Sequence, residues 1–251
     1  MGLFLLASAA AALLPAATGA GVMIDMYSDA QCPCSAQATS DLVELLRDPE
    51  FSMVDMQLWF VGGGVTGTEP GKCIHGEGEC VGQRFFSCAQ NATWAGLQRP
   101  AEPRGQFSGP SFRQSPLWMD FQRCAYGPCD GSAAILGPSH PCKTYTTFTE
   151  TSKNSIMRDC AAKLNMSWAE LSACGGGARG QALMTGSGEV SKMRKVEYGL
   201  QGLPVIRVNG VHVKTKRPIP IVCGPSPEEV RAVVCAAIPA AQRPQRCKRD
   251  Q

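Results

Sequence analysis

Residues 22–35 read Val-Met-Ile-Asp-Met-Tyr-Ser-Asp-Ala-Gln-Cys-Pro-Cys-Ser. The first six are mostly apolar and β-forming, which predicts a strand over residues 22–27. Over residues 35–47, alanine and leucine recur at helical spacing until an Asp-Pro pair ends the pattern. The stretch therefore predicts a strand, a turn and a helix, with Cys32 and Cys34 between the strand and the first turn of the helix.

A second strand and a C-terminal unit are predicted by similar patterns. Apolar residues alternate with mainly polar ones over residues 54–61, as in a half-buried strand, before three glycines. Residues 203–208 and 211–213 flank Asn209-Gly210, a strong signal for a β-hairpin. A helix is predicted from Ser226, because serine is a good N-cap and is followed by a proline and two acidic residues.

The segment between these two units is rich in cysteine and in helix signals. We interpret residues 66–177 as a disulfide-rich, mainly helical insertion, because it holds eight cysteines, at positions 73, 80, 88, 124, 129, 142, 160 and 174. Short helices are predicted around residues 115–125 and 155–164, and another opens at Ser167 with a capping-box pattern. A weakly periodic helix over residues 178–198 precedes the hairpin, so the chain starts as β-α-β and ends as α-β-β-α.

The N-terminus predicts export from the cytosol. Residues 1–20 carry no charge and end in small residues, which is typical of a secretory signal peptide cleaved near Ala20. An uncleaved membrane anchor is the alternative, but the apolar core has only about a dozen residues where a membrane span needs about 20. We therefore expect a single domain over residues 21–251, with no membrane span after the signal is removed.

The cysteine count points to the same compartment. Thirteen cysteines in 251 residues fit an oxidising environment, and the odd number leaves at least one thiol unpaired or bridged to another molecule. Sequons at Asn91 and Asn165 predict glycosylated, exposed loops. The net charge is only +3, and the basic tail at residues 243–249 is better explained as a solvated terminus than as a nucleic-acid site.

The element order is that of a thioredoxin-like fold, in which redox cysteines lie where the first strand meets its helix. Cys32 occupies that place, and unpaired amides at a helix N-terminus lower the pKa of a thiol and favour the reactive thiolate. We therefore expect Cys32 to be a catalytic nucleophile. The alternative is that Cys32 and Cys34 are both structural and bridged to the insertion.

Position 35 is a serine where a C-x-x-C redox site has its second cysteine. Such a site forms a mixed disulfide but cannot resolve it with its own fourth residue. Cys34 is a candidate for that step only after movement, because a bridge between residues two apart is geometrically tight. A small external thiol or a second thiol on the substrate would serve instead. We accordingly group Cys32, Cys34 and Ser35 as candidate catalytic residues.

Pro204 is the fourth candidate. A proline that opens a strand is expected at a sheet edge or after a cis peptide bond. In thioredoxin-like proteins a cis-proline lies against the active-site cysteine, and Leu203-Pro204 stands at the matching point of this chain. We expect a cis bond here, with an ordinary strand-opening proline as the alternative.

A second motif carries a resemblance to a known family. The segment Cys73-Ile-His-Gly-Glu-Gly-Glu-Cys80, continuing through Gln83 to Cys88, resembles the C-Q-H-G-x-x-E-C-x-x-N-x-x-x-x-C signature of the gamma-interferon-inducible lysosomal thiol reductases. Ile74 and Gln83 replace the family's Gln and Asn. The resemblance implies an enzyme that reduces protein disulfides without a cofactor in an acidic endosomal or lysosomal setting, and the signal peptide also allows an extracellular destination. A small-molecule or protein thiol would be the reductant.

Other functions remain as alternatives. Cys73, His75, Cys80 and Cys88 could in principle bind zinc, but they lack paired C-x₂-C knuckles and an oxidising compartment favours bridges. We expect no metal site, and a hydrogen-bonding role for His75. A non-catalytic, cysteine-rich secreted binding protein is the main rival function, and a disulfide isomerase or mixed-disulfide trap on the same fold is the next.

Overall fold

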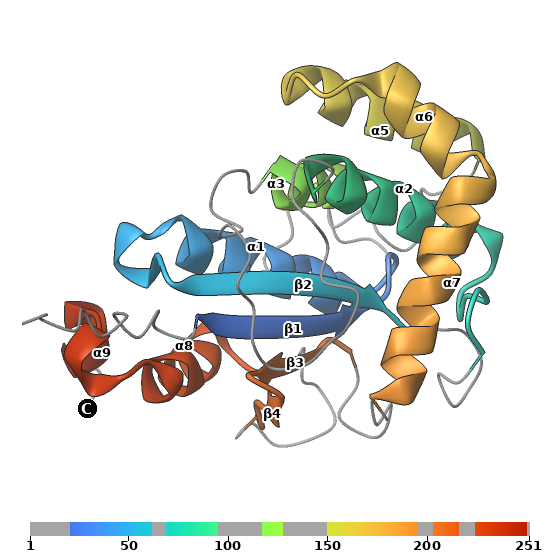
Figure 1. Cartoon of the computed structure of the whole chain (residues 1–251). Helices are drawn as coiled ribbons and strands as arrows, with labels where there is room; N and C mark the ends of the chain where they lie inside the picture. Colours follow the sequence, from blue (N-terminus) through green and yellow to red (C-terminus); the bar gives the residue numbers. More distant parts are fainter. Residues whose placement is uncertain are drawn as a thin grey trace, which may run out of the picture.

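The computed structural model describes residues 21–61, 69–94, 117–127, 150–194, 203–215 and 224–249. A four-stranded sheet forms its centre, in the order β2-β1-β3-β4 (Figure 1). β1 (Val22–Ser28) pairs in parallel with β2 (Val54–Phe60) and antiparallel with β3 (Val205–Val208), which pairs antiparallel with β4 (Val211–His212). The predicted signal peptide and parts of the predicted insertion lie outside the described residues.

Helices cover the sheet and extend beyond it. Figure 1 shows α1, α2 and α3 on one side of the sheet, α5 and α6 farther out, α7 along one end, and α8 and α9 at the opposite end. Their bounds are α1 Pro33–Arg47, α2 Glu77–Trp94, α3 Leu117–Tyr126, α5 Glu150–Lys163, α6 Trp168–Gly175, α7 Ala178–Met193, α8 Pro227–Ala237 and α9 Gln245–Arg249, with short 3-10 turns at Pro49–Phe51 and Ala240–Gln242. None of the described helices combines the length and the apolar character that crossing a membrane requires.

The predicted helix starts are close to the observed ones. The first helix begins at Pro33, two residues earlier than its apolar period indicates, because Cys32 is the N-cap. The Ser167 hydroxyl accepts a hydrogen bond from the Glu170 amide at 3.3 Å and starts α6. At the start of α8, the capping box between Ser226 and Glu229 is complete in both directions.

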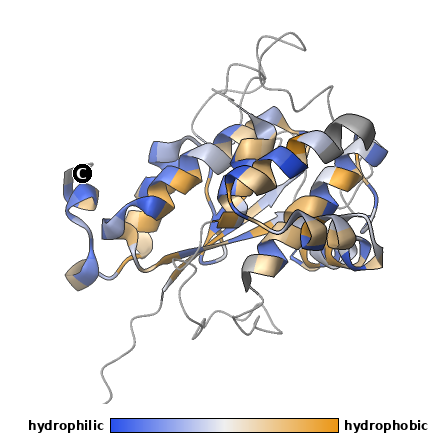
Figure 2. Cartoon of the chain, turned by 90° about the horizontal axis from the view of Figure 1, so that it is seen from above, coloured by the Kyte–Doolittle hydropathy of each residue, from blue (hydrophilic) through white to orange (hydrophobic). Residues whose placement is uncertain are grey.

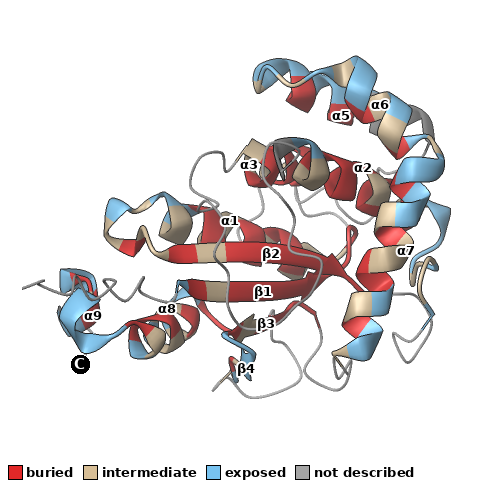
Figure 3. Ribbon diagram, viewed as in Figure 1, coloured by how far each residue is buried: buried red, intermediate tan, exposed pale blue. Residues whose placement is uncertain are grey.

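The main core lies between the sheet and helices α1, α2, α3 and α8. Alternate strand residues enter it, including Ile24, Met26, Met56 and Ile206, all of them fully buried. Figure 2 shows that hydrophobic and hydrophilic residues alternate along the helices. Figure 3 shows that the strands of the sheet centre are buried almost throughout, while the outer helices carry many exposed residues. This one-sided burial follows because the inner helices pack against the sheet and the outer helices pack against the inner ones.

The sequence pattern predicts that β2 is buried on one face only, and this prediction is wrong, because both faces are buried. Gln57 and Trp59, which alternate with the core residues of β2, are each only 7% exposed. The alternation itself is present, but the second face is also covered: Trp59 packs with Tyr27 and Leu203, and Val190 of α7 lies against them. A strand pattern reports which residues share a face, but it does not report whether a distant helix returns to cover that face.

α7 also completes the hydrogen bonding of β2, which is an edge strand. The Ser187 hydroxyl accepts from the Phe60 amide at 2.6 Å, and the Ser191 hydroxyl donates to the Phe60 carbonyl at 3.2 Å. Both serines are buried. Unpaired backbone groups on a buried edge would be costly, so these hydroxyls provide the partners that a further strand would otherwise supply.

A buried ion pair ties the end of α7 to the middle of the sheet. The Asp25 carboxylate lies 2.6 Å from the Arg194 guanidinium and accepts a hydrogen bond from the Trp59 indole at 2.8 Å. Arg194 also donates to the Tyr27 hydroxyl at 3.0 Å and lies over the Trp59 ring. This arrangement pairs the Asp25 carboxylate with a cation and an indole donor on the second face of the sheet.

Asp25→Ala is therefore expected to lower the free energy of unfolding by about 3 kcal/mol, because it leaves the Arg194 charge without its buried partner. Asp25→Asn keeps an acceptor for Trp59 and should cost clearly less. Urea denaturation of the oxidised proteins measures both. Equal, small losses in the two variants would contradict this account of the pair.

Candidate active site

Cys32 and Pro204, predicted from separate motifs, lie next to each other. Cys32 is the N-cap of α1, and its thiol donates a hydrogen bond to the Leu203 carbonyl at 3.6 Å. The Leu203–Pro204 peptide bond is cis, as predicted. Cys32 is the one free cysteine among the described residues and is partly exposed. The fold therefore places an unbridged thiol against the start of β3.

The charge state of Cys32 differs from the sequence-based expectation. Burial, and then the nearby Asp29 carboxylate, raise the pKa of the Cys32 thiol to about 12. The Ser35 hydroxyl and the amides of Ser35 and Cys34 lower the pKa, as a helix N-terminus should, but they do not offset the other two effects. The prediction of a lowered pKa is thus wrong for this conformation, in which Cys32 rests as a thiol.

The other two candidates of the motif lie on the first turn of α1. Ser35 is fully buried, and its hydroxyl has no hydrogen-bond partner among the described residues, although it lies close enough to lower the pKa of Cys32. Cys34 is disulfide-bonded, and its partner lies outside the described residues. Of the two motif cysteines only one is therefore structural, and Cys34 is not a free resolving thiol in this state.

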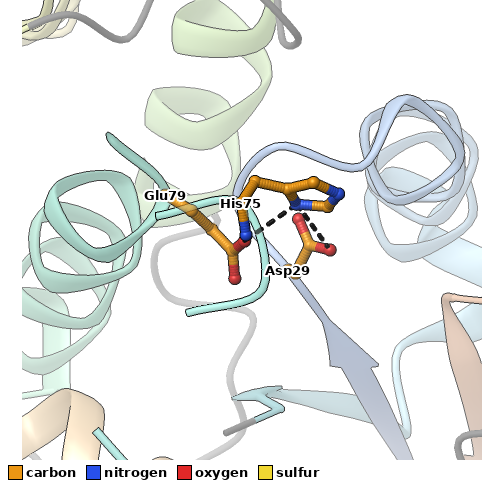
Figure 4. A group of neighbouring side chains, drawn as sticks. All are labelled: Asp29, His75 and Glu79. Carbon is orange, nitrogen blue, oxygen red and sulfur yellow. Dashed lines mark hydrogen bonds and ion pairs between the residues drawn. The ribbon is translucent and has the colours of Figure 1, made fainter. Parts of the chain in front are cut away.

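Asp29, which acts on the charge of Cys32, forms a cluster with the side chains of His75 and Glu79 (Figure 4). The His75 ring nitrogen Nδ1 lies 2.8 Å from the Glu79 carboxylate and 3.7 Å from the Asp29 carboxylate. Asp29 and Glu79 are buried, whereas the His75 side chain is 29% exposed. Asp29 comes from the turn between β1 and α1, Glu79 from the first turn of α2, and His75 from the turn before α2.

Local features of the second motif build this cluster. Gly76 has a φ of +87°, which glycine tolerates and which turns the chain from His75 into α2. Gln83, one turn after Glu79, donates to the Glu79 carboxylate at 2.6 Å. A Cβ at position 82 would lie 2.8 Å from the Cβ of Ala30, so the glycine there lets α2 approach the β1–α1 turn.

The pKa of Asp29 is shifted by its surroundings. Burial and the charge of Glu79 raise the pKa of Asp29 to about 7, against the opposing effects of His75 and of the Gln31 and Cys32 amides. The hydrogen bond to Glu79 raises the pKa of His75 above its ordinary value. His75 is thus a hydrogen-bonding residue, as expected, and its charge lowers the pKa of Asp29.

The cluster has the composition of a metal site, since its three ligand atoms lie within 4.8 Å of one another. Its hydrogen bonds favour a different assignment. The Glu79 carboxylate already accepts from the His75 amide at 2.7 Å, from the His75 ring and from Gln83. Asp29 accepts from the Gln31 amide at 2.7 Å. We therefore describe a hydrogen-bonded charge cluster and assign no metal to it.

The zinc alternative for the second motif is wrong. Cys73 is bridged to Cys80, and Cys88 is bridged to Cys174 on α6, so the thiolates that zinc would need are consumed in disulfides. Two more disulfides, Cys124–Cys160 and Cys235–Cys247, join α3 to α5 and α8 to α9. The described part of the insertion is disulfide-rich and helical, as predicted.

Sequence reasoning missed two residues around the site. Asp29 carries no motif, and Tyr126 of α3 lies almost a hundred residues away. The Tyr126 hydroxyl donates to the Asp29 carbonyl at 3.3 Å and accepts from Gln122 at 3.0 Å, and burial raises its pKa. Asp29 lies in the same turn as Cys32, but no local pattern shows that Glu79 and His75 of another segment lie beside its carboxylate. The proximity of Tyr126 depends on how α3 packs against that turn.

Comparisons with known proteins agree with this site. Residues 23–108 match the model of the gamma interferon inducible lysosomal thiol reductase (GILT) family, and this range holds both the Cys32 motif and the Cys73–Cys88 motif. No curated protein matches the sequence.

A solved structure supports the fold. The MdbA protein, a thiol-disulfide oxidoreductase from Actinomyces oris, is 16% identical, with a TM-score of 0.51 and coverage of 88% of this chain and 83% of that one. A thioredoxin-like oxidoreductase from Silicibacter pomeroyi DSS-3 is 15% identical, with a TM-score of 0.45 and coverage of 87% of each chain. The chain is therefore similar to the gamma interferon inducible lysosomal thiol reductase family over residues 23–108 and has a thioredoxin-like fold.

Proposed function

We propose that the enzyme reduces disulfides of protein substrates and that Cys32 is its nucleophile. The observation that carries this proposal is the free Cys32 thiol at the N-terminus of α1, 3.6 Å from the Leu203 carbonyl beside cis-Pro204. The Cys32 residue is partly exposed, and its sulfur faces amide donors that stabilise negative charge. Pro204 would help to hold the substrate strand beside it.

The proposed reaction is thiol-disulfide exchange. The Cys32 thiol loses its proton to solvent, its sulfur attacks one substrate sulfur, and the other substrate sulfur leaves as a thiolate that takes up a proton. A low-molecular-weight or protein thiol then attacks Cys32 and releases the second substrate thiol. A second molecule of that reductant regenerates Cys32. Two reductant thiols are thus oxidised to one disulfide for each substrate disulfide reduced.

The bridged Cys34 and the serine at position 35 support this dependence on an external reductant. Cys34 could act as a resolving thiol only after its own disulfide opened. Ser35 cannot form a disulfide, but its buried hydroxyl is placed to donate to the Cys32 thiolate. We therefore assign Ser35 the stabilisation of charge on sulfur and assign Cys34 no part in turnover.

We also propose that the protein acts within or beyond the secretory pathway, in endosomes, lysosomes or outside the cell. The family match and the four disulfides of the described residues support an oxidising route of maturation. Of the two sequons, Asn165 is exposed in the turn after α5 and suits glycosylation, whereas Asn91 lies in α2 instead of the loop expected from sequence. The same proposal includes cleavage of a signal peptide, residues 1–20. The mature protein is then one domain over residues 21–251, with its insertion near residues 66–177.

The test is to trap the first covalent intermediate. The unreduced full-length protein is incubated with a peptide that contains one disulfide, and the mixed disulfide is mapped by mass spectrometry after proteolysis. We expect the peptide on Cys32. Capture on another cysteine, or no capture, would contradict the assignment.

The same sample distinguishes a reductase, which releases its substrate, from a protein that only traps it as a mixed disulfide. Excess free cysteine should release the peptide as a dithiol if the protein is a reductase. A mixed disulfide that persists in excess thiol would instead favour the trap.

A further inference from the structure

A buried carboxylate is built into the turn that carries the nucleophile. Asp29 precedes Cys32 by three residues and is 1% exposed. It accepts hydrogen bonds from the backbone amides of Gln31, at 2.7 Å, and of Cys32. Because the same turn fixes both the carboxylate and the sulfur, the two groups keep a constant relation, and burial leaves little water to screen them.

The groups that face Asp29 come from four parts of the fold. They are Cys32 at the start of α1, His75 in the turn before α2, Glu79 in α2 and the Tyr126 hydroxyl of α3. When His75 is protonated, its charge is balanced by Glu79 at 2.8 Å. The cluster then holds one uncompensated negative charge, which belongs to Asp29 and lies beside the sulfur.

We propose that Asp29, held by the His75–Glu79 pair, is a positioning residue that sets the ionisation of Cys32: its charged carboxylate opposes formation of the thiolate, and its protonation removes that opposition. The inference rests on the proposed role of Cys32. The proton that leaves Cys32 goes to solvent, and Asp29 acts only through its charge. Both groups carry a negative charge when ionised, so each disfavours ionisation of the other.

The pH dependence follows from the sign of this interaction. Burial and Glu79 raise the pKa of Asp29 to about 7, so Asp29 is neutral at pH 5.5 and charged at pH 8.5. The thiolate fraction of the wild type should therefore rise less steeply than tenfold per pH unit between about pH 6 and pH 8. Below and above this interval it should regain the full slope, until Cys32 itself titrates.

The experiment measures the rate constant for alkylation of Cys32 by iodoacetamide between pH 5.5 and pH 9, with the site followed by mass spectrometry. Asp29→Asn removes the charge and keeps an oxygen that can accept from Gln31 and Cys32. The ratio of the Asp29→Asn rate to the wild-type rate should be near one at pH 5.5. It should rise through pH 7 to about tenfold at pH 8.5, which corresponds to one unit in the pKa of Cys32.

Two further variants complete the design. Asp41→Asn is the control: it removes a carboxylate from α1, where Asp41 accepts a hydrogen bond from Gln37. It should leave the dependence of the Cys32 alkylation rate on pH unchanged. His75→Gln removes the positive charge that lowers the pKa of Asp29, so the flattened interval should move to higher pH. Because His75 is partly exposed, this variant tests the proposal even if Asp29→Asn fails to fold.

The outcomes are distinguishable. A ratio that is the same at every pH would mean that Asp29 only supports the turn, and it would overturn the inference while leaving Cys32 as the nucleophile. An unmoved interval in His75→Gln would overturn it as well. If Cys32 were not alkylated in any variant, the proposed function itself would fail, and the inference with it.

Discussion

Cys32→Ser is expected to lower the rate of peptide-disulfide reduction by at least about a thousandfold, because a hydroxyl cannot form the mixed disulfide. The assay follows a dye-labelled peptide disulfide with excess free cysteine as reductant. Cys32 takes part in no bridge, so the serine variant should keep the disulfides and the unfolding midpoint of the wild type. A variant that folds normally and retains more than a tenth of the activity would show that another cysteine is the nucleophile.

A substitution in the first turn of α1 tests how much the Ser35 hydroxyl contributes to the reaction rate. Ser35→Ala removes one donor to the developing thiolate and should slow the reaction about tenfold, the effect of one hydrogen bond to a charged group. Ser40→Ala, farther along α1, is the matched control and should leave the rate unchanged. If Ser35→Ala had no effect, the buried hydroxyl would have no part in stabilising charge on Cys32.

The second large effect concerns stability. Cys88→Ala/Cys174→Ala opens a bridge between α2 and α6 that joins residues 86 positions apart. The loop is long even though the Cys124–Cys160 bridge shortens it, so the chain-entropy account predicts a loss of about 4 kcal/mol in the free energy of unfolding. The stacked rings of Phe85 and Trp168, 5.6 Å apart at the same interface, remain as its support.

Urea denaturation under non-reducing conditions measures this loss. Cys235→Ala/Cys247→Ala is the matched control, because it removes a bridge of similar burial that closes a sequence separation of only 12. It should cost about 3 kcal/mol. If the short loop proved the costlier one to open, local packing rather than loop length would decide the contribution of these bridges.

Much of the site could be predicted from local patterns. Cys32 follows a strand and precedes a helix, and that order alone places it at a helix N-terminus. Pro204 opens a strand beside a hairpin signal, and its cis bond was predicted by analogy with the cis-proline of thioredoxin-like proteins. The position of Cys32 depends on backbone conformation over a few residues, which short sequence patterns report directly.

The ionisation of Cys32 could not be predicted in that way. The helix amides lower the thiol pKa as expected, but burial and Asp29 act in the opposite direction and are stronger. Burial depends on α2, α3 and β3 meeting around the turn, and these elements are far apart in the chain. The charge of Asp29 depends in turn on His75 and Glu79. The motif that contains these two residues does not indicate that they lie beside Asp29.

The sequence by itself determined the order of strands and helices, the nucleophile candidate at a helix N-terminus and the family signature, because all of these are written in short stretches of neighbouring residues. Only the tertiary structure decided which cysteines of the described residues pair, that both faces of β2 are covered, and that the buried carboxylates of Asp29 and Glu79 meet His75 next to the turn that carries Cys32. The physical reason is that burial and unscreened charge arise between segments distant in the chain, and local pattern carries no record of that proximity.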